Sequence, residues 1–299
     1  MKPPIGDPND VPMRDAATVL LLRDGREGLE VFMLKRNLNS DFVGGAYVFP
    51  GGAVDLADRE DELGPVCVGR TDAEASRRLG IDRGGLAYWV AAIRESFEEA
   101  GLLLAYDRHG DIVDLDDAAA VARWSEHRTE VDSGRRRLIE VCSAEGLRLA
   151  VDGMHYFGHW ITPIGAPRRY DTRFFLAAAP ERQTPLHDDH EVIDNVWVRP
   201  ADGLRRAETG ELMMLPPTIS SLRAMARFDT VADALGAATE IVTVPRILPK
   251  VIAVDGGVRI VLPGEPAYDD DRADLPPDVD WNRISSAAGT TGFDVAEAP

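Results

Sequence analysis

The chain has 299 residues, of which 44% are hydrophobic and 28% charged, a composition typical of a globular protein with a substantial core. Its 33 basic and 51 acidic residues give a net charge of 33 − 51 = −18, and so acidic a surface disfavours binding to nucleic acid and to anionic membranes. We find no apolar run of the ~18 residues that span a membrane, no secretory pattern in MKPPIGDPND and no disulfide framework, so we expect a cytoplasmic protein.

Two strands are predicted first along the chain, at 16–24 and 29–37, and the Gly-Arg-Glu-Gly between them predicts a hairpin. A short strand is expected within 42–55, where AYVF stands between two pairs of glycines. Residues 56–85 are polar and lack a clear apolar period, so we expect an irregular segment there.

A helix with two contrasting faces is predicted around AAIRESFEEAGLLL, residues 91–104. At about 100° per residue, its apolar side chains form one broad stripe, while Glu95, Glu98 and Glu99 share the opposite side. Gly101 stands where the end of a helix favours a residue with positive φ. The apolar stripe consists of Leu86, Trp89, Val90, Ile93, Phe97 and Ala100.

Three carboxylates on one helix face have two interpretations. The simpler one is a solvated acidic face, in which the like-charge pair at i,i+4 weakens the helix by roughly 0.2–0.5 kcal/mol. The other is a cation site, because oxygen ligands carried by one rigid element suit magnesium or manganese. The glutamates alone do not decide between these interpretations, so the surrounding sequence must.

The rest of the chain predicts helices and strands in irregular alternation. This alternation, with its hairpins, indicates an α/β or α+β protein whose mixed sheet is covered by helices. The expected elements are a largely helical stretch at 116–150, strands at 155–163, 172–180 and 195–200, helices near 221–240 and a hairpin at 251–264.

Two segments together resemble the Nudix box, whose pattern is G-x5-E-x7-R-E-U-x-E-E-x-G-U, with U a bulky aliphatic residue. In FPGGAVD the opening glycine is Gly52, and RESFEEAGL supplies the second half of the pattern from Arg94 onward. The chain departs from the pattern at Asp58, where the family has Glu, and at Ser96, where it has an aliphatic residue. Between Asp58 and Arg94 lie 35 residues in place of seven, so an insertion of 35 − 7 = 28 residues splits the box.

The resemblance implies an α/β fold, a Nudix-type α/β/α sandwich with a mixed sheet and helical insertions, over residues 14–264. Outside it lie an N-terminal extension, 1–13, and the segment 265–299, whose nine acidic side chains against two arginines predict an extended tail. The insertion at about 59–85 borders the helix of the glutamates, and we expect it to shape the substrate pocket.

The family also implies a metal site, because divalent cations serve the hydrolysis of diphosphate bonds. Glu95, Glu98 and Glu99 are the implied ligands of magnesium or manganese, and the backbone carbonyl of Gly51 is a further candidate. Glu95 and Glu98 are also the implied catalytic carboxylates. Arg94 is implied to pair with these carboxylates and to orient them.

Further site residues follow from the resemblance. The family often supplies one more acid, as a metal ligand or general base, just before a late strand. Glu191 in HEVIDNVWV fits this place, although Asp188, Asp189 or His190 would serve equally and an ordinary acidic loop is the alternative interpretation. Arginine forks match phosphate geometry, so three arginines are candidates for substrate binding. These are Arg36, Arg169 and Arg173.

The split box, together with ITP, RRYDTRFF and LPPT, resembles the Nudix branch that includes a coenzyme A diphosphatase of animal peroxisomes. Coenzyme A or an acyl-coenzyme A is therefore the leading substrate. A coenzyme A signature of other Nudix proteins is kept at Arg36 and Gly45 but lost at Asn37 and Asp41. NADH and ADP-ribose therefore stay open, as does a Nudix module that senses a nucleoside diphosphate derivative without cleaving it.

Two further expectations concern the setting of the protein. The chain ends in AEAP, without an S-K-L-type peroxisomal address, which favours the cytoplasm. Dimers are common in the Nudix family, so a homodimer is expected from the resemblance alone. If the match to the box were fortuitous, Glu98→Gln would relieve repulsion and raise stability without affecting any activity.

Overall fold

The computed structural model describes residues 11–38, 44–59, 63–117, 120–186, 192–254 and 257–268. Most of the predicted N-terminal extension and of the predicted acidic tail lies outside these residues. Among the helices that are described, none is both long and apolar enough to cross a membrane.

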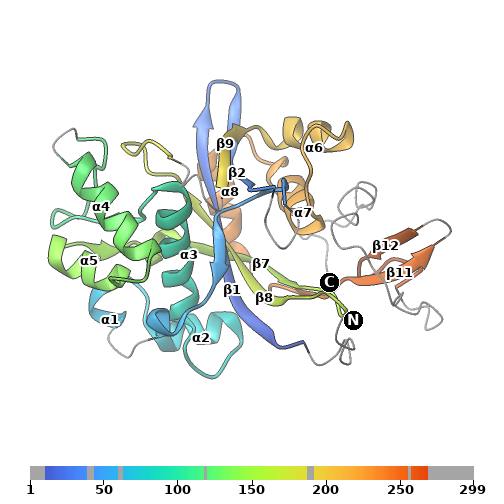
Figure 1. The fold of residues 1–299 in the computed structure, drawn as a ribbon, viewed down its shortest axis with the longest axis horizontal. Coiled ribbons are helices and arrows are strands. Elements are labelled where there is room, and N and C mark those ends of the chain that lie inside the picture. The colour runs from blue at the N-terminus through green and yellow to red at the C-terminus, as the bar shows by residue number, and fades with distance from the viewer. Residues whose placement is uncertain are drawn as a thin grey trace, which may run out of the picture.

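A mixed sheet of eight strands forms the middle of the molecule (Figure 1). Its strands are β1 (Met13–Gly25), β2 (Gly28–Arg36), β3 (Tyr47–Val48), β4 (Gly51–Ala53), β7 (His155–Ile161), β8 (Arg169–Ala178), β9 (Val192–Val198) and β10 (Arg246–Ile247). Six of them follow the order β10-β7-β8-β1-β2-β3, while β4 pairs with β1 and β9 pairs with β2. Strand β1 is parallel to β8 and antiparallel to β2 and β4. Two small sheets pair β5 (Ala105–Tyr106) with β6 (Arg148–Leu149) and β11 (Lys250–Val254) with β12 (Gly257–Val261).

Helices cover both faces of the central sheet, which makes the fold the predicted α/β/α sandwich (Figure 1). One layer contains α1 (Leu63–Val66), α2 (Asp72–Leu79), α3 (Leu86–Ala100), α4 (Val121–Asp132) and α5 (Leu138–Glu145). The other contains α6 (Pro200–Glu208), α7 (Pro216–Met225) and α8 (Val231–Glu240). Short 3-10 helices occur at η2 (Leu56–Arg59) and η3 (Val151–Gly153). Each layer buries its own apolar cluster against one face of the sheet.

The α3 helix forms where the apolar stripe predicts it. Trp89, Ile93 and Phe97 are fully buried, and the Trp89 ring lies 4.5 Å from the ring of Phe175 in β8. Gly101 ends the helix with φ 69°, and its amide donates to the carbonyl of Phe97. This geometry is the left-handed helix end that glycine favours. The apolar stripe therefore fixes α3 against the sheet.

The expectation of an irregular segment at 56–85 is wrong, because η2, α1 and α2 lie there. The sequence contains a signal for α2 in Thr71 and Glu74, which form a capping box. Thr71 accepts a hydrogen bond from the Glu74 amide, and Glu74 accepts one from the Thr71 amide at 2.8 Å. The insertion is thus a helical unit with its own helix start, and α2 packs against α3.

We predict that Thr71→Ala lowers the free energy of unfolding by about 1 kcal/mol, because it removes the hydroxyl that caps α2. Urea denaturation followed by circular dichroism would measure this change. Thr71→Ser keeps the hydroxyl and serves as the matched control. Equal losses in both variants would show that the cap does not stabilise the insertion.

Candidate active site

The three glutamates of α3 do not form a solvated face. The side chains of Glu95 and Glu98 are only 14% and 12% exposed, and Glu99 as a whole residue is 7% exposed. The simpler interpretation of this acidic cluster is therefore wrong. Carboxylates this far removed from water need compensating charge or hydrogen bonds.

Arg94 supplies much of that compensation. Its Nη1 atom lies 2.7 Å from Glu98 Oε2 and 2.9 Å from Glu95 Oε1. Its Nη2 atom donates to the carbonyl of Ala53 in β4 at 2.7 Å and to Asp58 Oδ2 at 3.0 Å, while Nε donates to Asp58 Oδ1 at 3.1 Å. One guanidinium therefore connects α3, β4 and η2.

Asp58 is a site residue that the sequence interpretation passed over as a departure from the pattern. The Asp58 residue is 2% exposed. Both of its carboxylate oxygens accept hydrogen bonds from the Arg94 guanidinium, and Oδ2 also accepts one from the Asp55 amide at 2.9 Å. The signal was its position six residues after Gly52, where the Nudix pattern has a glutamate. The split box therefore closes in space despite the 35 intervening residues.

The glycines of β4 allow α3 to approach the sheet closely. A Cβ atom on Gly52 would lie 2.4 Å from Glu95 Oε1, and one on Gly51 would lie 2.4 Å from Thr18 Oγ1. The Gly51 amide donates to Glu99 Oε2 at 3.0 Å, so the glycine pair and the acidic face are in direct contact. Only glycine fits at these two positions without displacing its neighbours.

The electrostatics of this cluster favour added positive charge. Burial raises the pKa of Glu98 to about 8, with Arg94 opposing the rise and Glu95 adding to it. Burial also raises the pKa of Asp58, again against the effect of Arg94. The pKa of Arg94 is raised as well, because the three carboxylates that it contacts outweigh the effect of its burial. Even where Glu98 is protonated, the single Arg94 guanidinium faces the carboxyl groups of Glu95 and Asp58, with Glu99 close by at the Gly51 amide.

The oxygen ligands and the charge of the cluster suit a divalent cation, although the side chains are not arranged as a preformed coordination site. No group of three or more His, Cys, Asp or Glu side chains among the described residues is arranged to hold a metal ion. Glu95 and Glu98 lie against Arg94, and Glu99 lies against the Gly51 amide. Hard oxygen donors in excess of positive charge nevertheless are what magnesium and manganese prefer.

Arg173, a predicted substrate arginine, lies in β8. It is level with Gly52 across the sheet, because both residues pair with Ala17 of β1. It is buried, makes an ion pair with Asp171 and lies over the ring of Tyr88 in α3 at 5.4 Å. Its Nη1 atom also contacts His159. Burial, assisted by Arg173, lowers the pKa of His159 to about 3.

The other predicted residues lie farther along the sheet. Arg169 donates from Nε to the Thr162 carbonyl at 3.3 Å. Arg36 ends β2 opposite Val192 of β9, and its buried Nε has no hydrogen-bond partner among the described residues. Glu191 and its alternatives Asp188, Asp189 and His190 lie outside the described residues. The structure thus joins Gly51, Arg94, Glu95, Glu98 and Glu99 in one cluster, and the roles of all these residues stay predictions.

A family model described as the NUDT19 Nudix domain matches residues 70–225 of the chain. The Homo sapiens protein named acyl-coenzyme A diphosphatase NUDT19 is 28% identical over 281 residues, which cover 82% of this chain and 74% of that protein. The Gallus gallus protein of the same name is 27% identical and covers 86% of this chain and 80% of its own length. A crystal structure of a Nudix hydrolase from Alicyclobacillus acidocaldarius matches with a TM-score of 0.62 and 28% identity, covering 76% of this chain and 97% of the other.

We predict that Asp58→Asn lowers the free energy of unfolding by roughly 1–3 kcal/mol, because asparagine offers one acceptor oxygen where Asp58 offers two, and its amide donor would face an N–H of Arg94. Asp55→Asn is the matched control, since the Asp55 side chain is 62% exposed and lies 3.8 Å from Arg94. That control should change stability by less than about 0.5 kcal/mol in the same urea titration. A small effect of both substitutions would mean that the Asp58–Arg94 pair does not stabilise the fold.

Proposed function

This chain belongs to the Nudix hydrolase family, and we propose that it cleaves the diphosphate bond of coenzyme A or of an acyl-coenzyme A with a divalent cation. Membership of the family makes it a hydrolase of diphosphate bonds in nucleoside diphosphate derivatives. The choice of substrate is supported by its relatives, because the matched Homo sapiens and Gallus gallus proteins are named acyl-coenzyme A diphosphatases.

The observation that carries this proposal is the buried, negatively charged cluster at the split box. Glu95 and Glu98 share the Arg94 guanidinium with Asp58, and Glu99 accepts a hydrogen bond from Gly51. Hydrolysis of a diphosphate brings further negative charge to such a site. Substrate binding there requires a cation, which is why metal dependence belongs to the proposal.

We assign Glu95, Glu98 and Glu99, with the Gly51 carbonyl, to hold magnesium or manganese. When bound, the cation supplies charge neutralisation on the phosphates and activates the attacking water. The Arg94 side chain keeps Glu95 and Glu98 in place through its Nη1 contacts, and Asp58 keeps Arg94 in place. This division of roles explains why a buried arginine lies among the proposed ligands.

The attacking water must also lose a proton during hydrolysis. Glu98 and Glu191 are our candidates for the group that accepts it, and both are carboxylates of the kind that general bases use. The arginines Arg36, Arg169 and Arg173 remain candidates for holding the substrate. Arg173 is buried and paired with Asp171, and its guanidinium lies over the Tyr88 ring of α3. We therefore expect Arg173 to hold α3 in position rather than to contact the substrate.

We predict that Glu98→Gln lowers kcat/KM about 10²–10⁴-fold, because it removes a proposed metal ligand and proton acceptor. The measurement is release of phosphate-containing products from coenzyme A, acyl-coenzyme A, NADH, ADP-ribose and nucleoside triphosphates, with magnesium or manganese. Glu126→Gln, at an exposed position of α4, is the matched control and should retain full activity.

The panel also tests the alternatives. Turnover of one compound that is lost in Glu98→Gln and in chelator identifies both the reaction and its substrate class. Metal-dependent thermal stabilisation without turnover would indicate a sensing module. Higher stability of Glu98→Gln with no activity in any protein would contradict the proposed site.

We predict that Gly52→Ala weakens activation by magnesium roughly 10–100-fold, because its Cβ atom would push the Glu95 carboxylate out of place. The concentration of magnesium that gives half-maximal activity, or half-maximal thermal stabilisation, measures this effect. Gly236→Ala, at an exposed position of α8, is the control, since a Cβ atom there meets nothing within 4 Å. Unchanged activation in Gly52→Ala would remove Glu95 from the proposed ligands.

A further inference from the structure

A pocket of about 790 Å³ lies beside the first turn of α3, and the insertion forms most of its wall. We call it the insertion pocket. Its walls are basic on one part and apolar on another. Its characteristic lining residues are Arg59, Arg70, Arg83, Leu63, Cys67 and Leu86. This size is within the range of small-molecule binding pockets, and three guanidinium groups stand out in a protein with a net charge of −18.

Two acidic residues, Asp72 and Glu74, also line the insertion pocket, and their carboxylates accept hydrogen bonds at the starts of helices. Asp72 accepts hydrogen bonds from the amide of Gly84 at 3.0 Å and from the amide of Leu86 at 2.9 Å. Glu74 accepts from the amide and the hydroxyl of Thr71, both at 2.8 Å. These carboxylates start α3 and α2 and do not pair with the arginines of the pocket.

Two of the three arginines therefore have no carboxylate partner within the described residues. Neither Arg70 nor Arg83 has a carboxylate within ion-pair distance in the part of the chain that the structure describes, whereas Arg59 pairs with Asp15. The Arg70 guanidinium lies over the ring of Trp89 at 4.8 Å, and its buried Nε atom has no hydrogen-bond partner in the described ranges. Burial lowers the pKa of Arg70, and Glu74 attracts the guanidinium from longer range. Arg70 and Arg83 therefore both offer positive charge to an anion in the pocket.

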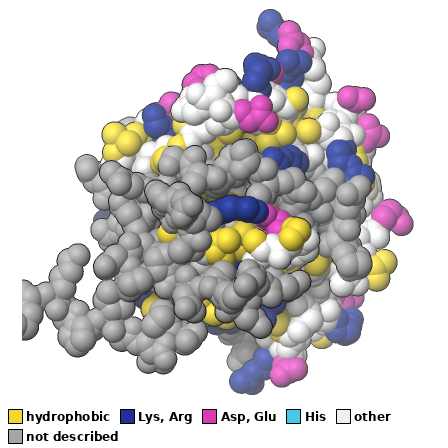
Figure 2. Space-filling view, turned by 90° about the vertical axis from the view of Figure 1, so that its right-hand side faces the viewer, with side chains coloured by type: hydrophobic (Ala, Val, Ile, Leu, Met, Phe, Trp, Pro, Cys, Tyr) yellow, Lys and Arg dark blue, Asp and Glu magenta, His cyan; other side chains and the backbone are white. Residues whose placement is uncertain are grey.

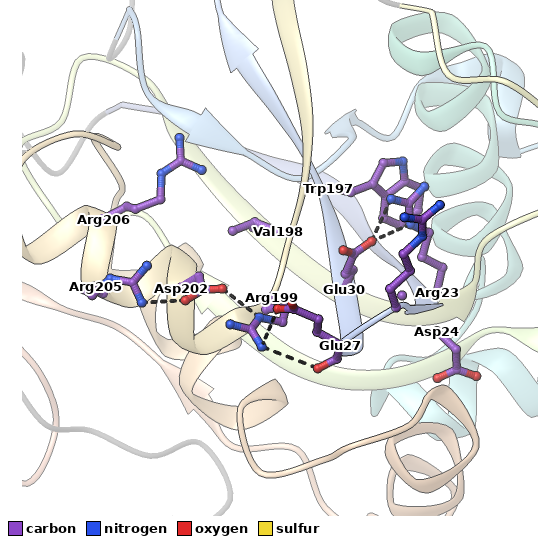
Figure 3. A pocket seen from close by; sticks show the side chains of 12 residues that line it. Arg23, Asp24, Glu27, Glu30, Trp197, Val198, Arg199, Asp202, Arg205 and Arg206 are labelled. Carbon is purple, nitrogen blue, oxygen red and sulfur yellow. Dashed lines mark hydrogen bonds and ion pairs between the residues drawn. The ribbon is translucent and has the colours of Figure 1, made fainter.

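A second arginine-rich pocket shows the contrast. It has a volume of about 720 Å³ at the tip of the β1–β2 hairpin, and most of its arginines are already neutralised (Figure 3). Arg23 pairs with Glu30 at 2.7 Å, and Asp202 binds both Arg199 and Arg205. The described side chains on the face in Figure 2 likewise mix both signs of charge. The insertion pocket therefore differs from the hairpin pocket in that most of its arginines, Arg70 and Arg83 of three, lack an ion pair among the described residues.

The insertion pocket is also close to the candidate active site along the chain. Arg59 directly follows Asp58, which holds Arg94. Ala87 lines the pocket eight residues before Glu95 on the same helix, a rise of about 12 Å. This rise is comparable to the length of a nucleotide. One end of a nucleotide bound at the glutamates would therefore come within reach of the arginine side chains of the insertion pocket.

We propose that the insertion pocket binds a phosphate monoester, held by Arg70 and Arg83. A phosphate monoester carries about −1.5 to −2 charges at neutral pH and offers three acceptor oxygens, which suits two arginine forks. Two sources of this group fit the pocket. One is the 3′-phosphate of coenzyme A, and this assignment rests on the proposed function; the other is a separate phosphate compound that acts as an effector.

The test uses the full chain with Arg70→Gln and Arg83→Gln, singly and together. Arg83 is exposed, so its single substitution carries little risk for folding. The matched control is Arg77→Gln, an exposed arginine of α2 outside the pocket. For each protein we would measure kcat/KM for coenzyme A and for 3′-dephospho-coenzyme A, and the affinity for inorganic phosphate by calorimetry.

We expect the variants to lose roughly tenfold to a hundredfold in kcat/KM for coenzyme A, with 3′-dephospho-coenzyme A unaffected. An unchanged ratio of the two substrates, with phosphate binding lost in the variants alone, would assign the pocket to a separate phosphate compound. Substrate ratio and phosphate affinity that match Arg77→Gln would overturn the proposal. If no protein hydrolyses coenzyme A, the proposed function fails, and the phosphate titration still decides the pocket.

Discussion

The ion pair between Arg94 and Asp58 is the constraint on which the rest of the candidate site depends. It joins η2 to α3 across 35 residues of sequence, and the same guanidinium reaches the Ala53 carbonyl and two glutamates. A buried pair of this kind adds little net stability compared with apolar packing, but removing Asp58 leaves the Nε group of Arg94 without its acceptor in the interior. The pair therefore specifies geometry, because α3 can satisfy Arg94 only where β4 and η2 meet. The close approach at Gly51 and Gly52 follows from that position.

The insertion is accommodated because it leaves the box after Asp58 and returns before α3 begins. Closing a longer loop costs only about 0.6 kcal/mol for each doubling of its length, so a self-contained insertion disturbs the box little. The insertion contains a capped helix, α2, whose apolar residues Ala75 and Leu79 join the core beside α3. Asp72 then caps the start of α3 itself. An element that could have separated the two halves of the box instead supports the helix that carries most of the site.

Charge in this protein is organised locally. The net charge of −18 describes the whole chain, yet carboxylates are concentrated around Arg94, and three arginines, Arg59, Arg70 and Arg83, line the insertion pocket. The insertion pocket and the carboxylates both border α3, an arrangement that suits a substrate carrying several phosphates, because a cation and the arginines would neutralise different parts of it.

Local patterns in the sequence determined the elements. The apolar stripe and Gly101 defined α3, the apolar runs around a glycine-rich turn defined β1 with β2, and the spacing of glycines and glutamates identified the family and nominated the residues of the candidate site. The capping box of α2 was equally local and was missed only because the segment is polar. The tertiary structure alone decided that the glutamates are buried, that Asp58 pairs with Arg94, that β1 lies parallel to β8, and that Arg70 and Arg83 face one pocket. Periodicity reports which face of an element is apolar over a few residues, whereas these contacts depend on where distant segments meet, and only the packed chain fixes that.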